Sequence, residues 1–162
     1  MKIAIIGASG RQGAKLLDEA ISRGHEVTAI ARDGGKVRQE KAQLLEKDLF
    51  ELSYDDLAPF DVIIDAFAVW DPERMSLHVT SLMHLADMLS GHQNRLLVVG
   101  GAGSLFINGE HSLRLMDAPD FPDAYKPTAN AMGEALEKLR QRDDVRWTYL
   151  SPAANFDADG AR

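Results

Sequence analysis

Seven consecutive small and polar residues near the start of the chain have the composition of a site that binds an anion through its backbone. An apolar segment, residues 3–6, precedes them, and a helix-like segment, residues 14–22, follows them. Backbone N–H groups in the first turn of a helix have no acceptor within the helix, and the helix dipole favours negative charge at that end. Glycines let a phosphate group approach the backbone and let the helix pack close to the strand. The sequence therefore predicts a diphosphate site at Gly7, Ala8, Ser9, Gly10, Arg11, Gln12 and Gly13.

The residue that follows the second predicted strand, residues 26–31, indicates which dinucleotide this site would hold. A carboxylate at this place hydrogen-bonds the ribose 2′-hydroxyl of NAD, whereas an arginine accommodates the 2′-phosphate of NADP. Here the strand leads into Arg32, whose planar guanidinium suits paired phosphate contacts, and Arg11 could supply a second cation. We therefore expect NADP(H) to be favoured over NAD(H). The alternative is that Arg32 is a solvated loop residue whose charge is partly offset by Asp33.

Two further segments are predicted to line the adenosine half of the coenzyme. Asp48 and Leu49 follow the third predicted strand, where a carboxylate can accept a hydrogen bond from the adenine amino group and a leucine can pack on the ring. The segment after the fourth predicted strand, Ala66, Phe67 and Ala68, includes small residues that let the coenzyme lie close. On the sequence alone Asp48 is equally expected to cap a helix or a turn, and Phe67 could belong to the core.

Apolar segments of strand length alternate with amphipathic segments of helix length, a pattern typical of a parallel sheet with helices on both faces. The expected strands are residues 2–6, 26–31, 42–45, 61–67, 95–99 and 145–150. The expected helices are residues 11–23, 52–57, 72–89 and 128–140, with residues 34–41 forming a short helix or a loop. The predicted fold class is α/β, a Rossmann-type doubly wound sheet of strand order 3-2-1-4-5-6 with its ligand across the carboxyl ends of the strands. Residues 104–124 show no periodicity and are too long for a simple connection.

Size and charge limit the classes of function that the chain can have. Its 162 residues fit a single domain, residues 1–162, and a formal net charge of −7 argues against nucleic acid as the main partner. The absence of cysteine excludes disulfides and thiolate chemistry, and the spacing of the five histidines does not suit a metal site. No run reaches the roughly 18 apolar residues of a membrane span, and the N-terminus enters a strand without a signal peptide. We expect a cytoplasmic protein with no membrane partner and no bound metal.

Six segments that together span nearly the whole chain carry a resemblance to a known family: residues 2–10, 24–29, 98–105, 120–122, 125–127 and 147–153. Through them the chain resembles the atypical short-chain dehydrogenases, in particular the small NmrA-like group of proposed NAD(P)H-flavin reductases. The resemblance implies NADPH bound by residues 7–13 and Arg32. It also implies that the backbone of Ser151, Pro152 and Ala153 lies near the nicotinamide end. Gly100, in a second glycine-rich turn, is a further coenzyme-binding candidate.

The chain departs from this family at the position of the usual proton donor. Short-chain dehydrogenases with a standard active site carry a Tyr-x-x-x-Lys pair, in which the lysine lowers the pKa of the tyrosine. Here Tyr125 is followed four residues later by Ala129, and the neighbouring lysine is Lys126, so carbonyl–alcohol chemistry by that route is not expected. Family members also continue beyond the sixth strand into segments that help to close the substrate pocket. We expect that C-terminal segment to be absent from this chain.

Hydride transfer to a conjugated acceptor needs few protein groups, because the nicotinamide carries the hydride and the protein aligns the acceptor ring. The catalytic candidates are Ser104, Tyr125 and Lys126. Tyr125 could stack on the acceptor or hydrogen-bond to it, while Ser104 and Lys126 could polarise one of its oxygens. Each also has a structural interpretation: Ser104 as a turn residue, Tyr125 as the residue ahead of a helix, and Lys126 as a solvated charge.

These inferences lead to an NADPH-binding oxidoreductase that transfers hydride to a flavin, a quinone or a similar small conjugated acceptor, with FMN or FAD among the candidate substrates. The alternative is an NmrA-like regulatory protein that senses NADP(H) without turnover. A sugar-nucleotide epimerase or reductase ranks last, because it would need the Tyr–Lys pair and a larger substrate domain. We expect a small-molecule acceptor as the partner, and the chain could form a homodimer.

Overall fold

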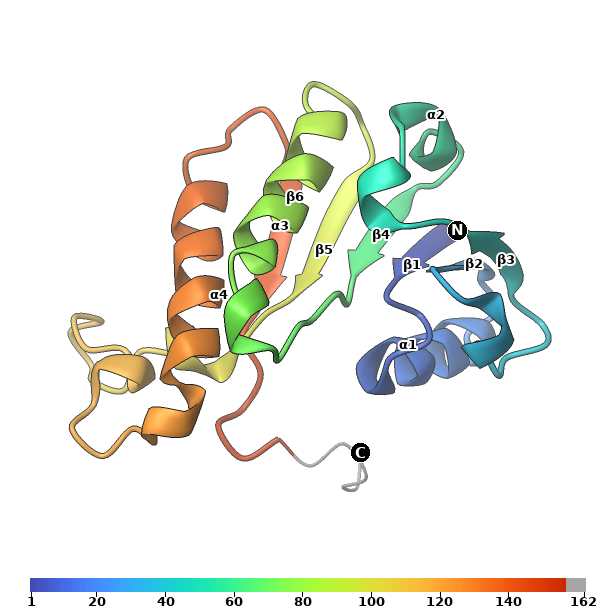
Figure 1. The fold of residues 1–162 in the computed structure, drawn as a ribbon. Coiled ribbons are helices and arrows are strands. Elements are labelled where there is room, and N and C mark those ends of the chain that lie inside the picture. Colours follow the sequence, from blue (N-terminus) through green and yellow to red (C-terminus); the bar gives the residue numbers. More distant parts are fainter. Residues whose placement is uncertain (157–162) are drawn as a thin grey trace.

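The computed structural model describes residues 1–156, and at its centre lies a six-stranded sheet whose strand pairs are all parallel (Figure 1). The strands lie in the order β3-β2-β1-β4-β5-β6, which confirms the predicted order. Their bounds are β1 (Lys2–Ile6), β2 (Glu26–Ala31), β3 (Gln43–Glu46), β4 (Val62–Asp65), β5 (Arg95–Val99) and β6 (Arg146–Leu150). The chain winds outward from β1 to β3 and then returns to place β4 on the other side of β1. The winding therefore reverses between β1 and β4, where a doubly wound sheet binds its ligand.

Helices cover both faces of this sheet. Their bounds are α1 (Arg11–Ser22), α2 (Tyr54–Leu57), α3 (Leu77–Met88) and α4 (Lys126–Leu139). The helices α3 and α4 lie side by side on one face, whereas α1 packs against β1 and β2 from the opposite face (Figure 1). The three layers that the alternating sequence pattern predicts are therefore present.

The first strand shows how the sequence fills both layers of the core. Ala4 and Ile6 belong to the core cluster that includes residues of α3 and α4, whereas Ile3 and Ile5 belong to the cluster that includes Leu17 of α1. Successive side chains of a strand point to opposite faces, so a strand that is covered on both faces is apolar at every position. This burial fixes β1, and with it the glycine turn that follows.

A side-chain cap sets the start of the helix that was predicted at residues 52–57. The carboxylate of Asp48 accepts the N–H of Phe50 at 2.9 Å and caps a 3-10 turn, Leu49–Glu51. The carboxylate of Asp56 then accepts the N–H of Ser53 at 2.8 Å, and α2 begins at the next residue. The predicted helix is therefore present but begins at Tyr54, after a separate 3-10 turn that lies outside the predicted range.

Two predicted elements around β4 are shorter in the structure. The strand expected at residues 61–67 ends at Asp65, whose carboxylate accepts the N–H of Phe67 at 3.0 Å and turns the chain away from the sheet. The helix expected at residues 72–89 begins at Leu77, because Asp71 caps a separate 3-10 turn, η3 (Pro72–Arg74), ahead of it. The β4–α3 connection is thus longer than predicted.

The stretch without periodicity, residues 104–124, contains little regular structure. It holds the 3-10 turn Leu115–Asp117 and an antiparallel bridge between Phe106 and Arg114, and 3-10 turns occupy its two ends. The guanidinium of Arg114 bonds the carboxylate of Asp117 at 2.8 Å. This connection projects from the sheet ahead of α4 (Figure 1).

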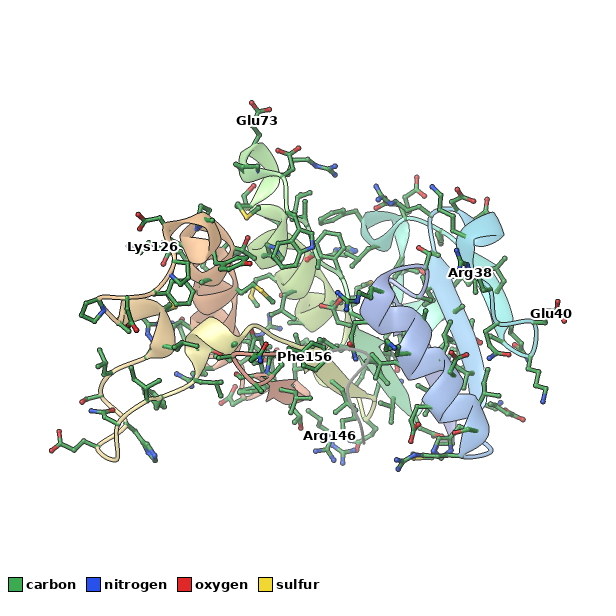
Figure 2. The ribbon with its side chains drawn as sticks, turned by 90° about the horizontal axis from the view of Figure 1, so that it is seen from below. Arg38, Glu40, Glu73, Lys126, Arg146 and Phe156 are labelled. Carbon is green, nitrogen blue, oxygen red and sulfur yellow. The ribbon has the colours of Figure 1, made fainter. Side chains whose placement is uncertain are left out.

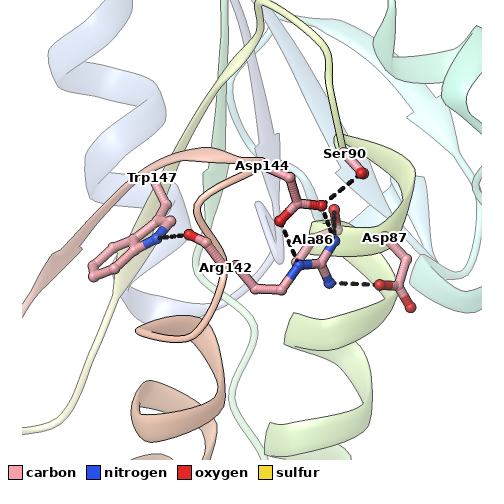
Figure 3. A network of polar contacts seen from close by, with 6 residues as sticks. All are labelled: Ala86, Asp87, Ser90, Arg142, Asp144 and Trp147. Carbon is pink, nitrogen blue, oxygen red and sulfur yellow. Dashed lines mark hydrogen bonds and ion pairs between the residues drawn. The ribbon is translucent and has the colours of Figure 1, made fainter.

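A polar network ties α3, α4 and β6 together at the amino ends of the strands (Figure 3). The guanidinium of Arg142 bonds Asp144 at 2.7 and 2.8 Å and Asp87 at 2.6 Å, and Ser90 donates to Asp144 at 2.6 Å. The indole of Trp147 donates to the carbonyl oxygen of Arg142 at 3.1 Å. The Arg142 guanidinium holds the pKa of Asp144 well below its usual range. The network braces the end of the sheet that is opposite the carboxyl ends of its strands.

Candidate functional site

A cavity of about 1110 Å³ opens at the carboxyl edge of the sheet, beside the ends of β1 and β4. Its wall comes from the glycine turn, the ends of β2 and β4, the segment after β3, and residues 154–156. Figure 2 views the molecule from this edge, and Phe156 lies there between α1 and the segment that leads into α4. The predicted coenzyme residues that line the cavity are Gly7, Ser9, Gly10, Arg11, Gln12, Arg32, Asp48, Leu49, Ala66, Phe67 and Ala68.

The glycine turn brings three pieces of backbone into direct contact. Gly7 has a φ of +75°, and a Cβ there would lie 2.8 Å from the carbonyl oxygen of Ala66. A Cβ on Gly13 would lie only 2.2 Å from the carbonyl oxygen of Gly7. The N–H of Gly10 donates to the same oxygen at 2.9 Å, and within residues 1–156 no side chain caps α1. The first turn of α1 therefore stands at the cavity wall, where helix amides and the helix dipole favour an anionic ligand.

The charge of the cavity wall is opposite to that of the whole chain. Among residues 1–156, four cationic residues line it, Arg11, Arg32, Lys47 and Arg74, against one carboxylate, Asp48. The chain as a whole carries a formal net charge of −7. Such a local reversal attracts an anionic ligand and repels a cationic one.

The environment of Arg32 bears on the two roles that the sequence left open for it, that of a phosphate-binding residue and that of a solvated loop residue. Its side chain is 69% exposed, and its Nε lies 3.9 Å from Oδ2 of Asp48, so this ion pair is loose. Asp33, which the sequence suggested as an offset, is engaged elsewhere: it pairs with Lys36 at 3.0 Å and accepts the N–H of Gly35 at 3.1 Å. The hydrogen bond from Lys36 lowers the pKa of Asp33. Arg32 thus lines the cavity with one weak ion-pair partner among residues 1–156.

Asp48 both caps a turn and lines the cavity. Its Oδ1 takes the N–H of Phe50, while Oδ2 is the atom closest to Arg32. Leu49 is 6% exposed and belongs to the core cluster while also forming part of the wall. The capping role and the ligand-binding role that the sequence left open for Asp48 can therefore coexist.

The segment after β4 is held in place from below by two buried polar groups. Asp65, 4% exposed, bonds the N–H of Phe67, and Nε2 of His78 lies 2.9 Å from the carbonyl oxygen of Val69. The ring of Phe67 meets the His78 ring edge-on at a centroid distance of 6.2 Å. Burial lowers the pKa of His78, which favours the neutral ring. These contacts fix the wall segment Ala66–Ala68 that we expect to lie against the coenzyme.

Asp65 should make the protein less stable as the pH rises. Burial raises the pKa of its carboxyl from 3.8 to about 6. Because the folded protein holds this proton more tightly than the unfolded chain, the contribution to stability is complete below pH 3.8 and is lost as the pH rises through about 6. The variant D65N keeps an acceptor for the Phe67 N–H and cannot ionise. The free energy of unfolding of D65N minus that of the wild type, measured with urea, should increase by up to about 3 kcal/mol between pH 4 and pH 7.

The control for this prediction is D120N, which removes an exposed carboxylate. Its stability difference from the wild type should change little over the same pH range. A D65N difference that is constant with pH, or that moves in the opposite direction, would contradict the assignment of a raised pKa to Asp65.

Of the three catalytic candidates, Tyr125 lines the cavity, with 59% of its surface exposed. The hydroxyl of Ser104 forms a hydrogen bond of 2.7 Å with the hydroxyl of Ser151 and donates to the carbonyl oxygen of Gly101 at 2.8 Å. These bonds link the ends of β5 and β6. Lys126 pairs with Asp123 at 2.6 Å and does not line the cavity. The structure therefore brings Tyr125 to the candidate site and places Ser104 and Lys126 outside its wall.

The remaining coenzyme candidates also lie behind or beside the wall. Ala8 and Gly13 are buried beneath the turn and shape it without lining the cavity. A Cβ on Gly100 would lie 2.0 Å from the ring of Tyr149, so this glycine is required for packing. The segment Ser151, Pro152 and Ala153 precedes the lining residues 154–156 directly.

Several lining residues were not predicted from the sequence. They are Ile6, Ile30, Ala31, Lys47, Phe50, Trp70, Arg74, Leu77, Ala154, Asn155 and Phe156. Lys47 and Phe50 flank the predicted pair at residues 48–49, which was the available signal for them. Trp70 lies in the connection expected after residue 67, and Arg74 was expected to lie in the helix at residues 72–89 but belongs to a 3-10 turn ahead of it. Among residues 1–156, no group of three or more His, Asp or Glu side chains could hold a metal ion.

In this part of the chain no helix is both long enough and apolar enough to cross a membrane.

Comparison with known proteins relates this site to a family. A family model described as NAD(P)H-binding matches residues 7–162. The protein YwnB of Bacillus subtilis is 51% identical over 163 residues, which cover 100% of this chain and 76% of YwnB. The crystal structure of a proposed NADH-flavin reductase from Streptococcus pneumoniae superimposes with a TM-score of 0.94 at 46% identity, covering 100% of this chain and 76% of that one. A proposed epimerase from Bacteroides thetaiotaomicron gives a TM-score of 0.76 at 37% identity, covering 95% and 71%.

Proposed function

The chain belongs to the NAD(P)H-binding family, and on that premise we propose that it is an NADPH-dependent reductase that passes hydride to a flavin, a quinone or a similar small conjugated acceptor. Its fold is that of NAD(P)H-binding oxidoreductases. The match to a proposed NADH-flavin reductase over the full length of this chain supports the class of reaction. The absence of a Tyr-x-x-x-Lys pair around Tyr125 supports an acceptor that needs no tyrosine proton donor.

The observation that carries this proposal is the cationic wall around a glycine turn. The first-turn amides of α1 and Arg11 would hold the diphosphate, and Arg32 would hold a 2′-phosphate on the adenosine ribose. Leu49 would pack on the adenine, and the segment Ala66–Ala68 would lie against the rest of the coenzyme. A ligand with two separate anionic groups fits the distribution of cations better than one with a single diphosphate.

The reaction balances without a further co-reactant. The bound dihydronicotinamide supplies a hydride, and the acceptor takes this hydride and one proton from water to become its dihydro form. The protein's own contribution is to position the two rings and to limit access of water around them. Tyr125 lines the cavity and can contact the acceptor, whereas Ser104 and Lys126 are engaged with Ser151 and Asp123.

The test is steady-state oxidation of NADPH with FMN, riboflavin and a set of quinones as acceptors, on the protein as it stands. We expect turnover with at least one of these acceptors and a larger increase in melting temperature with NADPH than with NADH at equal concentration. Coenzyme binding without turnover on the whole set would instead favour a regulatory protein that senses NADP(H). Failure of both coenzymes to bind would contradict either role.

A further inference from the structure

The cavity is large for a small-molecule site, and its aromatic residues extend past the segments that we expect to hold the coenzyme. At about 1110 Å³ it exceeds the roughly 300–1,000 Å³ that is usual for a small-molecule site. Four of the large apolar side chains that the described residues leave exposed line it: Trp70 (69%), Tyr125 (59%), Phe156 (54%) and Phe50 (43%). Exposed rings that gather at one cavity provide faces on which a second planar ring can stack.

Two cations of the wall, Lys47 and Arg74, have no role in holding the coenzyme as proposed. Arg32 follows β2, and the diphosphate site follows β1, but Arg74 lies in the connection after β4, on the other side of β1. Lys47 is paired with Asp56 at 2.7 Å. Within residues 1–156, the structure shows no ion pair for Arg74, which is exposed and lines the cavity. A second anionic group in the cavity, apart from those of the coenzyme, would account for it.

Hydrogen bonds order the backbone of the segment that carries Trp70 and Arg74. Val69, next to Trp70, is bonded through its carbonyl oxygen to His78 at 2.9 Å. The N–H of Arg74 donates to the carbonyl oxygen of Asp71 at 2.9 Å within a 3-10 turn. An ordered backbone beneath the two side chains lowers the entropic cost of binding a matching ligand.

We propose that Trp70, Tyr125 and Arg74 form the acceptor subsite, and that Arg74 makes it selective for a planar conjugated acceptor with a phosphate on its side chain. This inference rests on the proposed reductase function and adds the class of acceptor to it. The rings bind the conjugated plane, and the guanidinium bonds the phosphate through paired N–H donors. FMN has both features, whereas riboflavin has the same ring system without the phosphate.

The test compares these two flavins on the wild type, on R74Q and on R38Q. Arg38 is also exposed but does not line the cavity, so R38Q makes the same change in charge elsewhere. Binding is followed by flavin fluorescence on protein saturated with NADP⁺, and turnover is followed with NADPH. We expect the wild type to bind FMN at least roughly tenfold more tightly than riboflavin, as a charge-assisted hydrogen bond implies. R74Q should abolish this difference in affinity by weakening the binding of FMN alone, and R38Q should leave the difference unchanged.

A second variant tests the stacking part. W70L removes the ring and should weaken the binding of FMN and of riboflavin by similar factors, so that the preference for FMN is retained. Equal binding of both flavins by the wild type, or a preference that survives in R74Q, would overturn the role of Arg74. A loss of NADP⁺ affinity in R74Q would assign the residue to the coenzyme instead. Selective FMN binding without any turnover would sustain the subsite and contradict the reductase proposal.

Discussion

Replacing Gly13 with alanine is expected to weaken binding of NADPH and NADH by at least about 100-fold. The added Cβ would lie 2.2 Å from the carbonyl oxygen of Gly7 and 2.8 Å from the Cα of Ala8. Both atoms belong to the backbone at the end of β1, which is buried on both faces and cannot yield easily. The start of α1 must move away, and its amides then lose the diphosphate. Losing one or two charge-assisted hydrogen bonds accounts for the stated factor.

The measurement is isothermal titration calorimetry with each coenzyme, together with thermal unfolding of the free protein. The overpacked variant should also lose roughly 1–3 kcal/mol of stability. G109A is the matched control, because a Cβ at Gly109 meets no atom within 4 Å. It should bind both coenzymes as the wild type does. A folded G13A protein with unchanged affinity would contradict the assignment of the diphosphate to this turn.

The sheet and the glycine turn could be predicted because the backbone itself determines them. In β1, burial on both faces demands an apolar residue at every position, which the sequence displays directly. At Gly7 and Gly13 the contacts between backbone segments exclude any side chain. The glycines in the sequence therefore indicate where the backbone segments approach each other. The predicted strand order followed from the alternation of strands and helices and from the handedness of their connections.

The part of the cavity wall that contains Trp70 and Arg74 could not be predicted, because no hydropathy period marks the connection that carries it. Trp70 and Arg74 lie in a connection whose course depends on Asp65, Asp71 and His78. Asp71 caps a 3-10 turn inside the connection, and the bond between His78 and a carbonyl oxygen nine residues earlier is a tertiary contact. Such contacts leave no trace in a hydropathy pattern. The sequence therefore indicated the part of the cavity proposed for the coenzyme and left the part proposed for the acceptor undefined.

The same limitation explains the distribution of the catalytic candidates. Ser104, Tyr125 and Lys126 were selected because they lie near the expected cleft in the order of the chain. In the structure the hydroxyl of Ser104 pairs with that of Ser151, and Lys126 pairs with Asp123 three residues earlier. Proximity to a cleft along the chain does not determine which way a side chain points. Tyr125 lines the cavity because it precedes α4 at the end of a 3-10 turn.

Replacing Arg32 with glutamine is expected to weaken NADPH binding by roughly 10- to 100-fold and to change NADH binding by less than about threefold. The two coenzymes differ only in the 2′-phosphate that Arg32 is proposed to hold. The variant also leaves Asp48, whose Oδ2 is 3.9 Å from Arg32, without its cation. That carboxylate would then repel the phosphate, which adds to the loss for NADPH alone. Titration of both coenzymes at low and at high salt measures the selectivity and its electrostatic part.

The complementary variant D48N should act in the opposite direction. Asparagine can still cap the turn by accepting the Phe50 N–H, but it removes the one carboxylate that residues 1–156 place on the cavity wall. NADPH should therefore bind severalfold more tightly and NADH about equally. Equal weakening of both coenzymes would instead indicate that Asp48 contacts the adenine that they share. R38Q again serves as the control for a change in net charge. Tighter binding of NADH than of NADPH by the wild type would show that Arg32 has no role in selectivity. An arginine that contacts no 2′-phosphate cannot distinguish the two coenzymes, because they differ only in that group.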